Sequence, residues 1–343
     1  MYNRSIMNLS LGIVGLPNVG KSTLFKLLTK QEVNIANYPF TTINPNVAVL
    51  AVPDERLKKV AQISKPEKTV PAVVEFFDIA GLVKGANKGE GLGNQFLAQI
   101  RETNAIIQVV RCFPDPEIVH IEGNINPLRD METVNTELML KDLETVTKRM
   151  EKISGEAKSG QKEAIKELEI LNRIKIELEK GNLLITVFGK EFLEDPMIKN
   201  LNLLTAKKQI YLFNGDEKDL PQTLMTKVQA VKGDYAIADL ENNPDLSVLI
   251  KKAYEILDLI SFFTIVGEQE ARAWPAKRGT KVIEAAGMIH SDFEQKFIKA
   301  EVINWQKLLE AENWANARHK GLVKLEGKDY EVQDGDVIII KHG

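Results

Sequence analysis

The chain has 343 residues, of which 44% are hydrophobic and 27% are charged, an ordinary balance for a globular protein of two or three domains. Its 45 basic and 48 acidic residues give a net charge of about −3, which excludes binding to nucleic acid through a strong overall positive field. The single cysteine, Cys112, excludes a disulfide framework, and no signal segment or apolar run of ~18 residues is found, so we expect a cytoplasmic protein without a membrane partner.

Short apolar runs alternate with helix-like stretches along much of the chain, which predicts an α/β fold around a mostly parallel sheet. The runs predicted to be strands of this sheet are 11–15, 47–52, 73–79, 105–113, 209–214 and 235–240. Ligands of such sheets bind at the carboxyl ends of the strands, so the residues that follow these runs are the first to consider.

The first run leads into G-L-P-N-V-G-K-S-T at Gly15–Thr23, and a helix-like stretch follows it, which is the context a phosphate-binding P-loop requires. Gly15 and Gly20 let backbone N–H groups curl around a phosphate, Lys21 reaches the β- and γ-phosphates, and Ser22 offers a hydroxyl to Mg²⁺. A chance Gly-Lys turn would not explain the strand and the helix on either side. The nucleotide contacts predicted in this loop are Asn18, Val19, Gly20, Lys21, Ser22 and Thr23.

Two further segments have the character of switch regions that sense a γ-phosphate. The segment N-Y-P-F-T-T-I-N-P-N at 37–46 contains Thr41 and Thr42, either of which could close over Mg²⁺. The strand at 73–79 leads into Asp78-x-x-Gly81, where the carboxylate can hold Mg²⁺ through water and the Gly81 N–H can meet the γ-phosphate.

A glycine-rich stretch, K-G-A-N-K-G-E-G-L-G-N at 84–94, follows this motif. We expect a mobile loop that orders on γ-phosphate contact; a plain surface loop is the alternative. The residue after Gly81 is Leu82, whereas many switch GTPases place a water-orienting glutamine there, so another group must act or turnover must be slow.

From about 130 to 180 the sequence becomes helical and mixed in charge. Apolar residues recur at spacings of 4, 3, 4 and 3, as in a coiled-coil seam, at Met139, Leu143, Val146, Met150 and Ile153. A break with two glycines is expected at 155–160, and a second apolar stripe stops at Gly181. The pattern predicts an antiparallel helical hairpin inserted into the α/β domain; two ordinary surface helices are the alternative.

The run at 209–214 ends in Asn214-Gly215-Asp216-Glu217, at the position where a nucleotide base is usually recognised. A guanine site is expected to have Asn-Lys-x-Asp, but Gly215 replaces the lysine and Glu217 replaces the aspartate. The longer Glu217 side chain would crowd guanine, and Asp216 comes one residue early and should point elsewhere. These residues weaken the prediction of a guanine site without proving an adenine site. Asn214, Gly215 and Glu217 are the predicted base contacts.

The last 80 residues have a different character. A strand at 261–265, a helix at 280–288 and a hairpin around Asp334-Gly335 suggest a small α+β module. The segment W-P-A-K-R-G-T-K at 274–281 is a modest basic loop that could contact phosphate, although a solvated turn is the more ordinary interpretation.

Taken together, these motifs resemble the YchF family of Obg-like ATPases over nearly the whole chain, in order. The likeness includes D-I-A-G-L-V-K-G-A, G-E-G-L-G-N and the N-x-x-E of Asn214–Glu217. The C-terminal A-A-G-M-I-H-S-D-F-E and E-G-K-D-Y-x-V-x-D-G-D-V resemble that family's TGS module, a ubiquitin-like β-grasp. The resemblance implies a nucleotide-binding domain at 1–128 and 206–260, a helical domain at 129–205 and a TGS domain at 261–343.

The same resemblance implies ATP hydrolysis with Mg²⁺ and association with the ribosome, either the large subunit or a 70S-type particle. It assigns the switch threonine to Thr42, and it points to His120, in R-C-F-x-x-x-x-I-x-H, as the group that replaces the missing glutamine. His120, Lys21 and Gly81 are therefore the expected catalytic residues. Without the resemblance, a surface or structural role for His120 would be the more ordinary interpretation.

Asn18 leaves two interpretations open, because P-loop NTPases activated by K⁺ carry an asparagine there, yet an asparagine can also simply shape a loop. The sequence leaves three candidate functions. They are a slow, monomeric ATP-hydrolysing switch protein that binds ribosomes, a GTPase of the same fold, and a nucleotide-gated ribosome-binding scaffold in which hydrolysis is incidental.

Overall fold

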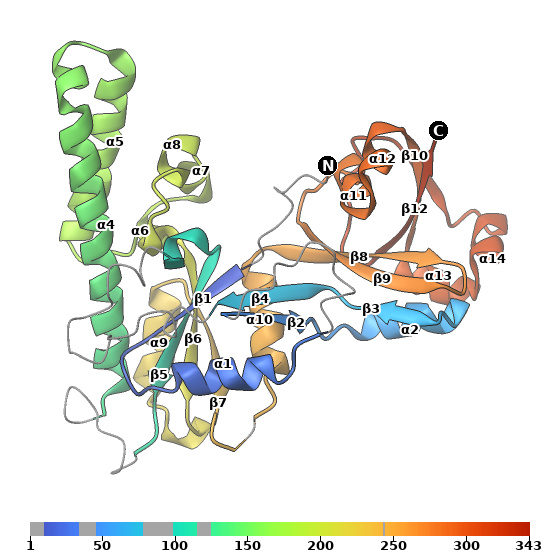
Figure 1. The fold of residues 1–343 in the computed structure, drawn as a ribbon, viewed down its shortest axis with the longest axis horizontal. Coiled ribbons are helices and arrows are strands. Elements are labelled where there is room, and N and C mark those ends of the chain that lie inside the picture. The colour runs from blue at the N-terminus through green and yellow to red at the C-terminus, as the bar shows by residue number, and fades with distance from the viewer. Residues whose placement is uncertain (1–9, 34–45, 78–98, 115–124, 243) are drawn as a thin grey trace.

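The computed structural model describes residues 10–33, 46–77, 99–114, 125–242 and 244–343. These residues form two six-stranded sheets and a long helical arm (Figure 1). The arm and the second sheet rise from opposite ends of the first sheet, which lies at the centre of the molecule. Within the described residues, no helix is both long and apolar enough to cross a membrane.

The first sheet is mostly parallel, with strand order β2-β4-β1-β5-β6-β7. Its strands are β1 (Ser10–Val14), β2 (Val47–Ala51), β4 (Val73–Phe77), β5 (Ala105–Arg111), β6 (Lys208–Asn214) and β7 (Asp234–Ala238). The ladder from β4 to β7 is parallel throughout, and β2 runs antiparallel to β4 at the edge. The carboxyl ends of β1, β5, β6 and β7 therefore meet along one side, as the apolar runs predicted.

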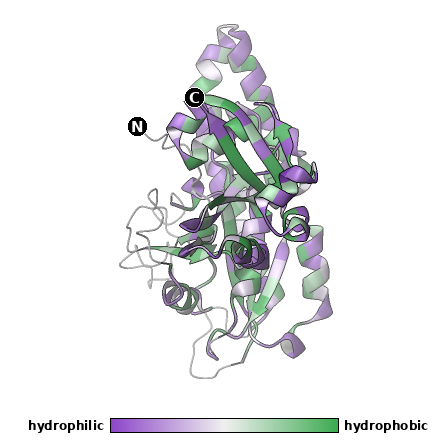
Figure 2. Cartoon of the chain, turned by 90° about the vertical axis from the view of Figure 1, so that its right-hand side faces the viewer, coloured by the Kyte–Doolittle hydropathy of each residue, from purple (hydrophilic) through white to green (hydrophobic). Residues whose placement is uncertain are grey.

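Helices cover both faces of this sheet. They are α1 (Lys21–Thr29) and α10 (Ser247–Ile256) on one face, and α4 (Pro127–Lys158) and α9 (Gln222–Ala230) on the other. The central strands β1, β5 and β6 are buried on both sides and consist mostly of apolar residues. In Figure 2, hydrophobic residues, in green, are prominent on the strands in view. The sheet thus provides a rigid frame for the loops at its carboxyl edge.

The helical arm is an antiparallel pair formed by α4 and α5 (Lys162–Glu179), inserted between β5 and β6. Arg149 and Glu167 join the two helices through bonds of 2.6 and 2.9 Å. The chain returns to the sheet through α6 (Leu184–Val187), α7 (Lys190–Leu193), α8 (Pro196–Lys199) and the 3₁₀ turn η3 (Leu204–Ala206). The predicted seam, from Met139 to Ile153, packs against apolar residues of α5 and of this return segment.

The position of the helix break differs from the prediction, because α4 continues through Gly155 to Lys158. The chain turns only at Gly160, which has a φ of 86°. The Gly160 N–H donates to Ala157 O and the Gln161 N–H donates to Glu156 O, the paired bonds of a Schellman cap. A glycine inside a helix costs about 1 kcal/mol, which the surrounding helical bonds and packing offset here.

The C-terminal module is a β-grasp. Its elements are β8 (Leu259–Val266), β9 (Glu270–Lys277), α11 (Val282–Ile289), α12 (Ser291–Gln295), β10 (Phe297–Asn304), α13 (Trp305–Ala311), α14 (Trp314–His319), β11 (Lys324–Glu326) and β12 (Asp336–His342). The hairpin β8–β9 is antiparallel, and the last strand, β12, lies parallel to β8 in the middle of the sheet. Helix α11 packs on one face of this sheet and α13 on the other.

The hairpin predicted around Asp334-Gly335 is wrong. The residues before the turn pair with the start of α11 instead, where the Val332 N–H donates to Thr280 O and the Val282 N–H donates to Tyr330 O. Strand β12 pairs with β10 and β8. Strand β12 lies between β10 and β8, and its neighbouring residues Val337 and Ile338 pack into the cores on opposite faces of the sheet.

The two sheets are joined by a segment of the first domain. Helix α2 (Glu55–Ser64) packs under the second sheet, and β3 (Lys68–Val70) pairs in parallel with β9 as the sixth strand of that sheet. Arg56 of α2 forms ion pairs with Asp54, at 2.8 Å, and with Asp334 of the β-grasp, at 2.7 Å. The predicted fold class is confirmed: a P-loop α/β domain with an inserted helical hairpin and a C-terminal β-grasp.

Candidate functional site

The phosphate-binding loop lies between β1 and α1 at the carboxyl edge of the first sheet. Gly15 has a φ of 149°, and a Cβ atom there would lie 2.5 Å from the Val109 carbonyl oxygen of the neighbouring strand. Asn18 has a φ of 62°, a left-handed conformation that asparagine tolerates better than most residues. The loop therefore needs a glycine at its first turn and favours an asparagine at its tip.

Lys21 occupies the first position of α1, and its side chain bends back over the loop. Its Nζ donates to the carbonyl oxygens of Gly15 at 3.0 Å and Leu16 at 2.6 Å. These contacts hold one positive charge next to the backbone N–H groups that begin α1. A nine-residue helix begins there, so its N-terminus adds partial positive charge at the same place. The loop is electrostatically suited to a phosphate chain.

The hydroxyl groups that follow Lys21 are accessible. Ser22 and Thr23 are both exposed in the first turn of α1, whereas Val19 is buried at 1% exposure in the core beneath the loop. The contrast separates the residues that anchor the loop from those that face outward. Ser22 and Thr23 are thus on the accessible side of the loop.

Asn214 connects the end of β6 to the phosphate loop. Its Nδ2 donates to Val19 O at 3.0 Å, and its Oδ1 accepts the Leu240 N–H at 3.1 Å. The side chain is only 2% exposed, so both bonds are made away from solvent. A Cβ atom at Gly20 would lie 2.5 Å from Asn214 Nδ2, which explains why a glycine stands at that end of the loop.

The residues after Asn214 differ in their surroundings. Gly215 has a φ of 150°, and a Cβ atom there would lie 3.2 Å from the Cβ of Cys112, so a side chain at this position is both strained and crowded. The Asp216 carboxylate pairs with Lys218 at 2.7 Å, consistent with the expectation that it points elsewhere. Glu217 is exposed at the start of a short 3₁₀ turn, η4 (Glu217–Asp219).

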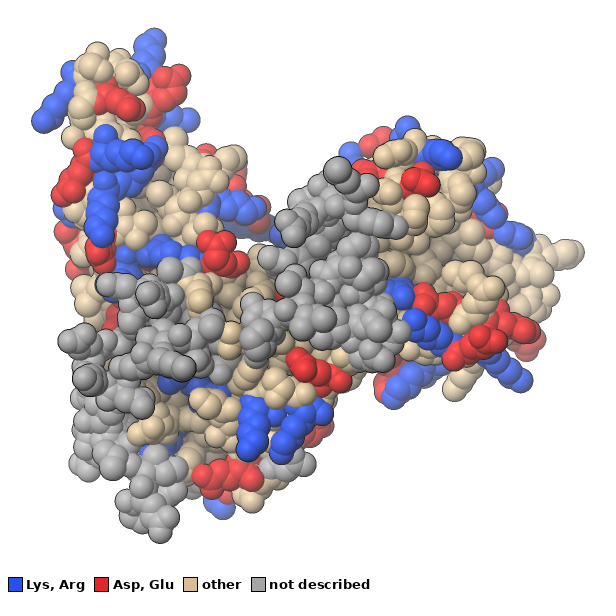
Figure 3. All heavy atoms as spheres, in the orientation of Figure 1, with Lys and Arg blue, Asp and Glu red and all other residues tan. Residues whose placement is uncertain are grey.

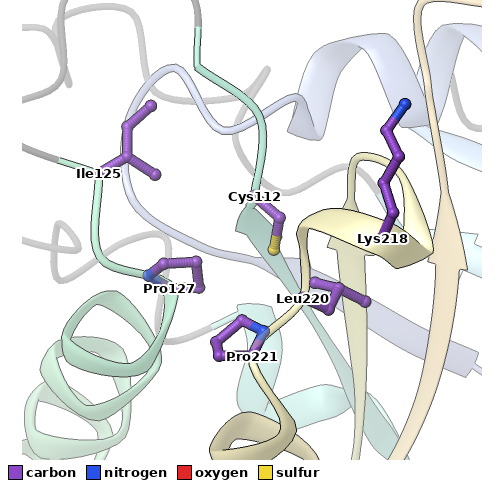
Figure 4. A pocket seen from close by; sticks show the side chains of 6 residues that line it. All are labelled: Cys112, Ile125, Pro127, Lys218, Leu220 and Pro221. Carbon is purple, nitrogen blue, oxygen red and sulfur yellow. The ribbon is translucent and has the colours of Figure 1, made fainter.

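A cavity of about 440 Å³ lies beside this segment (Figure 4). Its lining residues are Cys112, Ile125, Pro127, Lys218, Leu220 and Pro221. Cys112 connects the cavity to the base segment, because its N–H donates to Asn214 O at 2.8 Å. The cavity is thus bounded by the end of β5, by η4 and the residues after it, and by the start of α4.

Several predicted site residues lie outside the described residues: Thr42, Asp78, Gly81 and His120. The described part of the site brings together the phosphate loop, Asn214 and Gly215, with Glu217 two residues further on. Sequence reasoning missed the Leu240 N–H and the Val19 carbonyl, which anchor Asn214. Both are backbone groups, so no residue type at either position could have indicated them.

The donor chemistry of the site fits Mg²⁺. A hard cation prefers oxygen ligands, and Ser22 presents an exposed hydroxyl at the start of α1. Among the described residues, no group of three or more His, Cys, Asp or Glu side chains could form a metal cage. A metal at the described part of the site would therefore depend on hydroxyl groups together with the oxygens of a bound nucleotide.

The segment at 274–281 is not a loop throughout, because its first four residues form the end of β9, and it has less free charge than its sequence suggests. Arg278 pairs with Asp258 at 3.3 Å, and Lys281 pairs with Asp329 at 2.9 Å. On the arm, lysine and arginine residues are interspersed with acidic ones, as Figure 3 shows for the face in view. The described surface in this view carries mixed charges rather than one basic patch.

Comparison with protein families matches two parts of the chain. Residues 10–149 match a family described as "50S ribosome-binding GTPase", and residues 259–343 match the C-terminal domain of YchF GTPases, described as a protein of unknown function. The first match includes the phosphate loop, and the second covers the β-grasp.

Individual relatives match almost the whole chain. The chain is 45% identical to the "Ribosome-binding ATPase YchF" of Bacillus subtilis, over 97% of this chain and 98% of the relative. It is 42% identical to the protein of the same name from Escherichia coli O157:H7, with the same two coverages. The solved structure of the Schizosaccharomyces pombe YchF GTPase superposes with a TM-score of 0.86 at 36% identity, covering 99% of this chain and 100% of that one.

Proposed function

The chain belongs to the YchF family, and from that premise we propose that it is a ribosome-binding switch protein that hydrolyses ATP in preference to GTP. The observation that carries the proposal is the base segment. Asn214 is bonded into the phosphate loop, while the positions of the usual guanine-binding lysine and aspartate hold Gly215 and Glu217. The name of the bacterial relatives supports both the ATPase activity and the ribosome as partner.

Base preference follows from the shape of this segment. Gly215 cannot be replaced by a long side chain without strain, so the aliphatic stem that would cover guanine cannot be supplied from this position. Glu217 carries the carboxylate one methylene further from the backbone than an aspartate would. A guanine site needs its acceptor at a fixed distance from guanine N1–H and the 2-amino group, so a displaced acceptor favours adenine.

Hydrolysis is proposed to use the P-loop residues with the switch residues. Lys21 holds the β- and γ-phosphates, and the Gly81 N–H meets the γ-phosphate. Mg²⁺ would be held by Ser22 and Thr42, and by Asp78 through water; when bound, it neutralises the charge of the phosphates. Phosphoryl transfer of this kind depends on positioning and on charge stabilisation.

His120 is proposed to orient the attacking water, because Leu82 at the usual glutamine position has no polar group. We expect His120→Ala to slow ATP hydrolysis by about 100-fold or more while the Kd for ATP changes little. Single-turnover hydrolysis and equilibrium binding of ATP would measure the two effects separately. An unchanged rate would remove His120 from the mechanism.

A monovalent cation site is proposed at Asn18, whose left-handed backbone places it at the tip of the loop. The K⁺ would sit beside the phosphates and add to their neutralisation. Equal hydrolysis rates in K⁺ and Na⁺ buffers would count against this site.

A GTPase of the same fold is the second candidate, favoured by the description of the matching family and by the name of the fission yeast relative. The test is affinity and hydrolysis measured for ATP and GTP side by side, with and without ribosomes. Tighter binding of ATP and a rate raised by ribosomes are expected. Equal or tighter binding of GTP would overturn the base assignment, and absence of any ribosome effect would favour a scaffold in which hydrolysis is incidental.

A further inference from the structure

The turn that follows β7 contacts the base segment at the carboxyl edge of the first sheet. Strand β7 is the neighbour of β6 in this sheet (Figure 1), and Ala238 at its end is in register with Asn214. The Gly215 N–H donates to Ala238 O at 3.2 Å, so the two strand ends remain bonded beyond the ladder. Residues 239–242, hereafter the β7 turn, therefore begin directly beside the base segment.

Leu240 is the residue of the β7 turn that reaches the nucleotide site. Its N–H donates to Asn214 Oδ1 at 3.1 Å, and the residue is 2% exposed. A Cβ atom at Gly20 would lie 2.5 Å from Asn214 Nδ2 and 3.1 Å from Leu240 Cδ1. The side chains of Asn214 and Leu240 thus lie over the same glycine, at the point where the phosphate loop enters α1.

Asp239 holds the β7 turn closed. Its Oδ1 accepts the Glu241 N–H at 3.0 Å, and its Oδ2 accepts from Asn242 Nδ2 at 2.5 Å. A carboxylate that accepts the N–H group two residues later restricts the backbone of the residue in between. That residue is Leu240, so Asp239 controls the direction of the N–H group that bonds to Asn214.

The direction of this N–H group matters because Asn214 is buried. The Asn214 amide donates to Val19 O of the phosphate loop at 3.0 Å, and its oxygen accepts from the β7 turn. If the Leu240 N–H turned away, an acceptor on a side chain of 2% exposure would lose its donor. An unsatisfied buried acceptor is costly, so the amide would shift and disturb its bond to the phosphate loop.

We propose that Asp239 is a positioning residue of the nucleotide site. By closing the β7 turn it directs the Leu240 N–H to Asn214, and it thereby keeps the base segment aligned with the phosphate loop. The effect on nucleotide binding rests on the proposed function, whereas the hold of Asp239 on Leu240 does not. Because Asn214 is bonded to the phosphate loop, Asp239 should affect ATP and GTP alike.

The first measurement needs no nucleotide. Amide hydrogen exchange at Leu240 in the full chain reports whether its N–H is bonded. We expect Asp239→Ala to speed this exchange by about tenfold or more. Asp239→Asn should stay within about threefold of the native rate, because its amide oxygen can still accept the Glu241 N–H. Native exchange at Leu240 in Asp239→Ala would overturn the proposal.

The same loop offers a matched control in Asp245→Ala. Asp245 closes a similar turn, because its Oδ1 accepts the Ser247 N–H at 2.8 Å and its Oδ2 accepts from Ser247 Oγ at 2.9 Å. Its side chain is exposed at the start of α10, and this turn includes neither Leu240 nor Asn214. The variant should leave exchange at Leu240 unchanged. Faster exchange there in Asp245→Ala would show a general loosening of the loop and would count against a specific role of Asp239.

Nucleotide affinity is the second measurement. Asp239→Ala should raise the Kd values for ATP and GTP by about threefold to tenfold each, while kcat for ATP stays within about twofold, as expected when binding is lost uniformly. Asp239→Asn and Asp245→Ala should both keep native Kd values. Each of them also removes one negative charge, so together they separate the positioning effect from simple loss of charge near a triphosphate.

A double-mutant cycle connects the effect to Asn214. In an Asn214→Ala chain, Asp239→Ala should raise the Kd for ATP no further, because the acceptor of the Leu240 N–H is already absent. If Asn214→Ala does not fold, the rescue by Asp239→Asn decides. A native chain that bound neither ATP nor GTP would end the proposed function and the role of Asp239 in binding together. Native binding that Asp239→Ala leaves unchanged would overturn the role of Asp239 alone.

Discussion

At the scale of single residues, the Asn214 side chain joins the end of β6 to the phosphate loop. Its amide uses one donor and one acceptor to connect three segments that are far apart in sequence, at Val19, Asn214 and Leu240. The segment predicted to contact the base is therefore bonded directly to the phosphate loop. A substitution that alters this amide should affect every nucleotide rather than one base.

Asn214→Asp tests this role with almost no change in shape. A carboxylate can accept from the Leu240 N–H but cannot donate to the Val19 carbonyl, and it places a charge at a position of 2% exposure. We expect the free energy of unfolding to fall by about 1–3 kcal/mol and the Kd values for ATP and GTP to rise by similar factors. Urea denaturation and nucleotide titration measure these effects.

The control is Glu217→Asp, whose exposed side chain should leave the unfolding free energy within about 0.5 kcal/mol of the native value. That variant should change the ratio of the two Kd values instead. If Asn214→Asp altered the ratio while leaving stability unchanged, Asn214 would act on the base alone.

Residue types at the site could be predicted, but their partners could not. The order Gly, Gly, Lys, Ser after a strand defines a phosphate loop because each type has a distinct backbone or chemical role. The collision that fixes Gly20, in contrast, is with Asn214, which lies 194 residues later in the chain. Contacts of that kind depend on the tertiary arrangement, and the sequence around Gly20 carries no sign of them.

At the scale of elements, the hairpin arm follows from local patterns, whereas its exact turn does not. The seam from Met139 to Ile153 predicted a long amphipathic helix, and Gly181 marks the end of α5, where it has a φ of 79°. Helix propensity alone could not decide whether Gly155 or Gly160 ends the helix. The structure separates them, because Gly155 is helical and Gly160 is left-handed.

The two glycines should therefore respond in opposite directions to alanine. A Cβ atom at Gly155 would contact nothing within 4 Å, so Gly155→Ala should stabilise the arm by about 0.5–1 kcal/mol. Gly160→Ala has equal space but must adopt a φ of 86°, which should destabilise the arm by about 1–2 kcal/mol. Amide hydrogen exchange in α4 and α5 would report both changes, and equal signs would contradict the assigned helix end.

The C-terminal strand shows why turn dipeptides can mislead. Asp334-Gly335 does form a turn, but Asp334 Oδ1 accepts the Ser261 N–H and the Gly335 N–H donates to Ser261 O. The turn therefore docks on β8 instead of connecting two paired strands. The pairing partners of a strand that is buried on both faces depend on packing across the whole sheet. A local sequence pattern cannot reveal which strands those partners are.

At the scale of the whole molecule, the nucleotide-binding domain and the β-grasp share a core. One cluster of buried residues includes Leu57 and Val60 of α2 together with Phe263, Leu308 and Val337 of the C-terminal module. The ion pair between Arg56 and Asp334 crosses the same interface. The domain boundaries expected from the sequence remain a prediction, and the shared core indicates that these two domains do not unfold independently.

Phe263→Ala tests this coupling. The ring is fully buried in the shared core, with the Arg56 guanidinium 5.6 Å from its centroid, so its loss should destabilise the chain by about 3–5 kcal/mol. Calorimetry should show one transition for both domains, moved to lower temperature. Ile298→Ala, at a position 60% exposed on the same module, should leave the transition nearly unchanged. Two separate transitions in the native chain would contradict a common core.

The pairing of β3 with β9 affects the folding of the chain during its synthesis. Its partner β9 begins at Glu270, 200 residues after Val70, so at 5–20 residues per second the segment waits roughly 10–40 s during synthesis for the strand it pairs with. Until then the apolar face of α2 has no cover from the C-terminal module. The nascent chain should therefore need protection from chaperones over this interval, and truncated products that stop before β9 should be the ones most readily degraded.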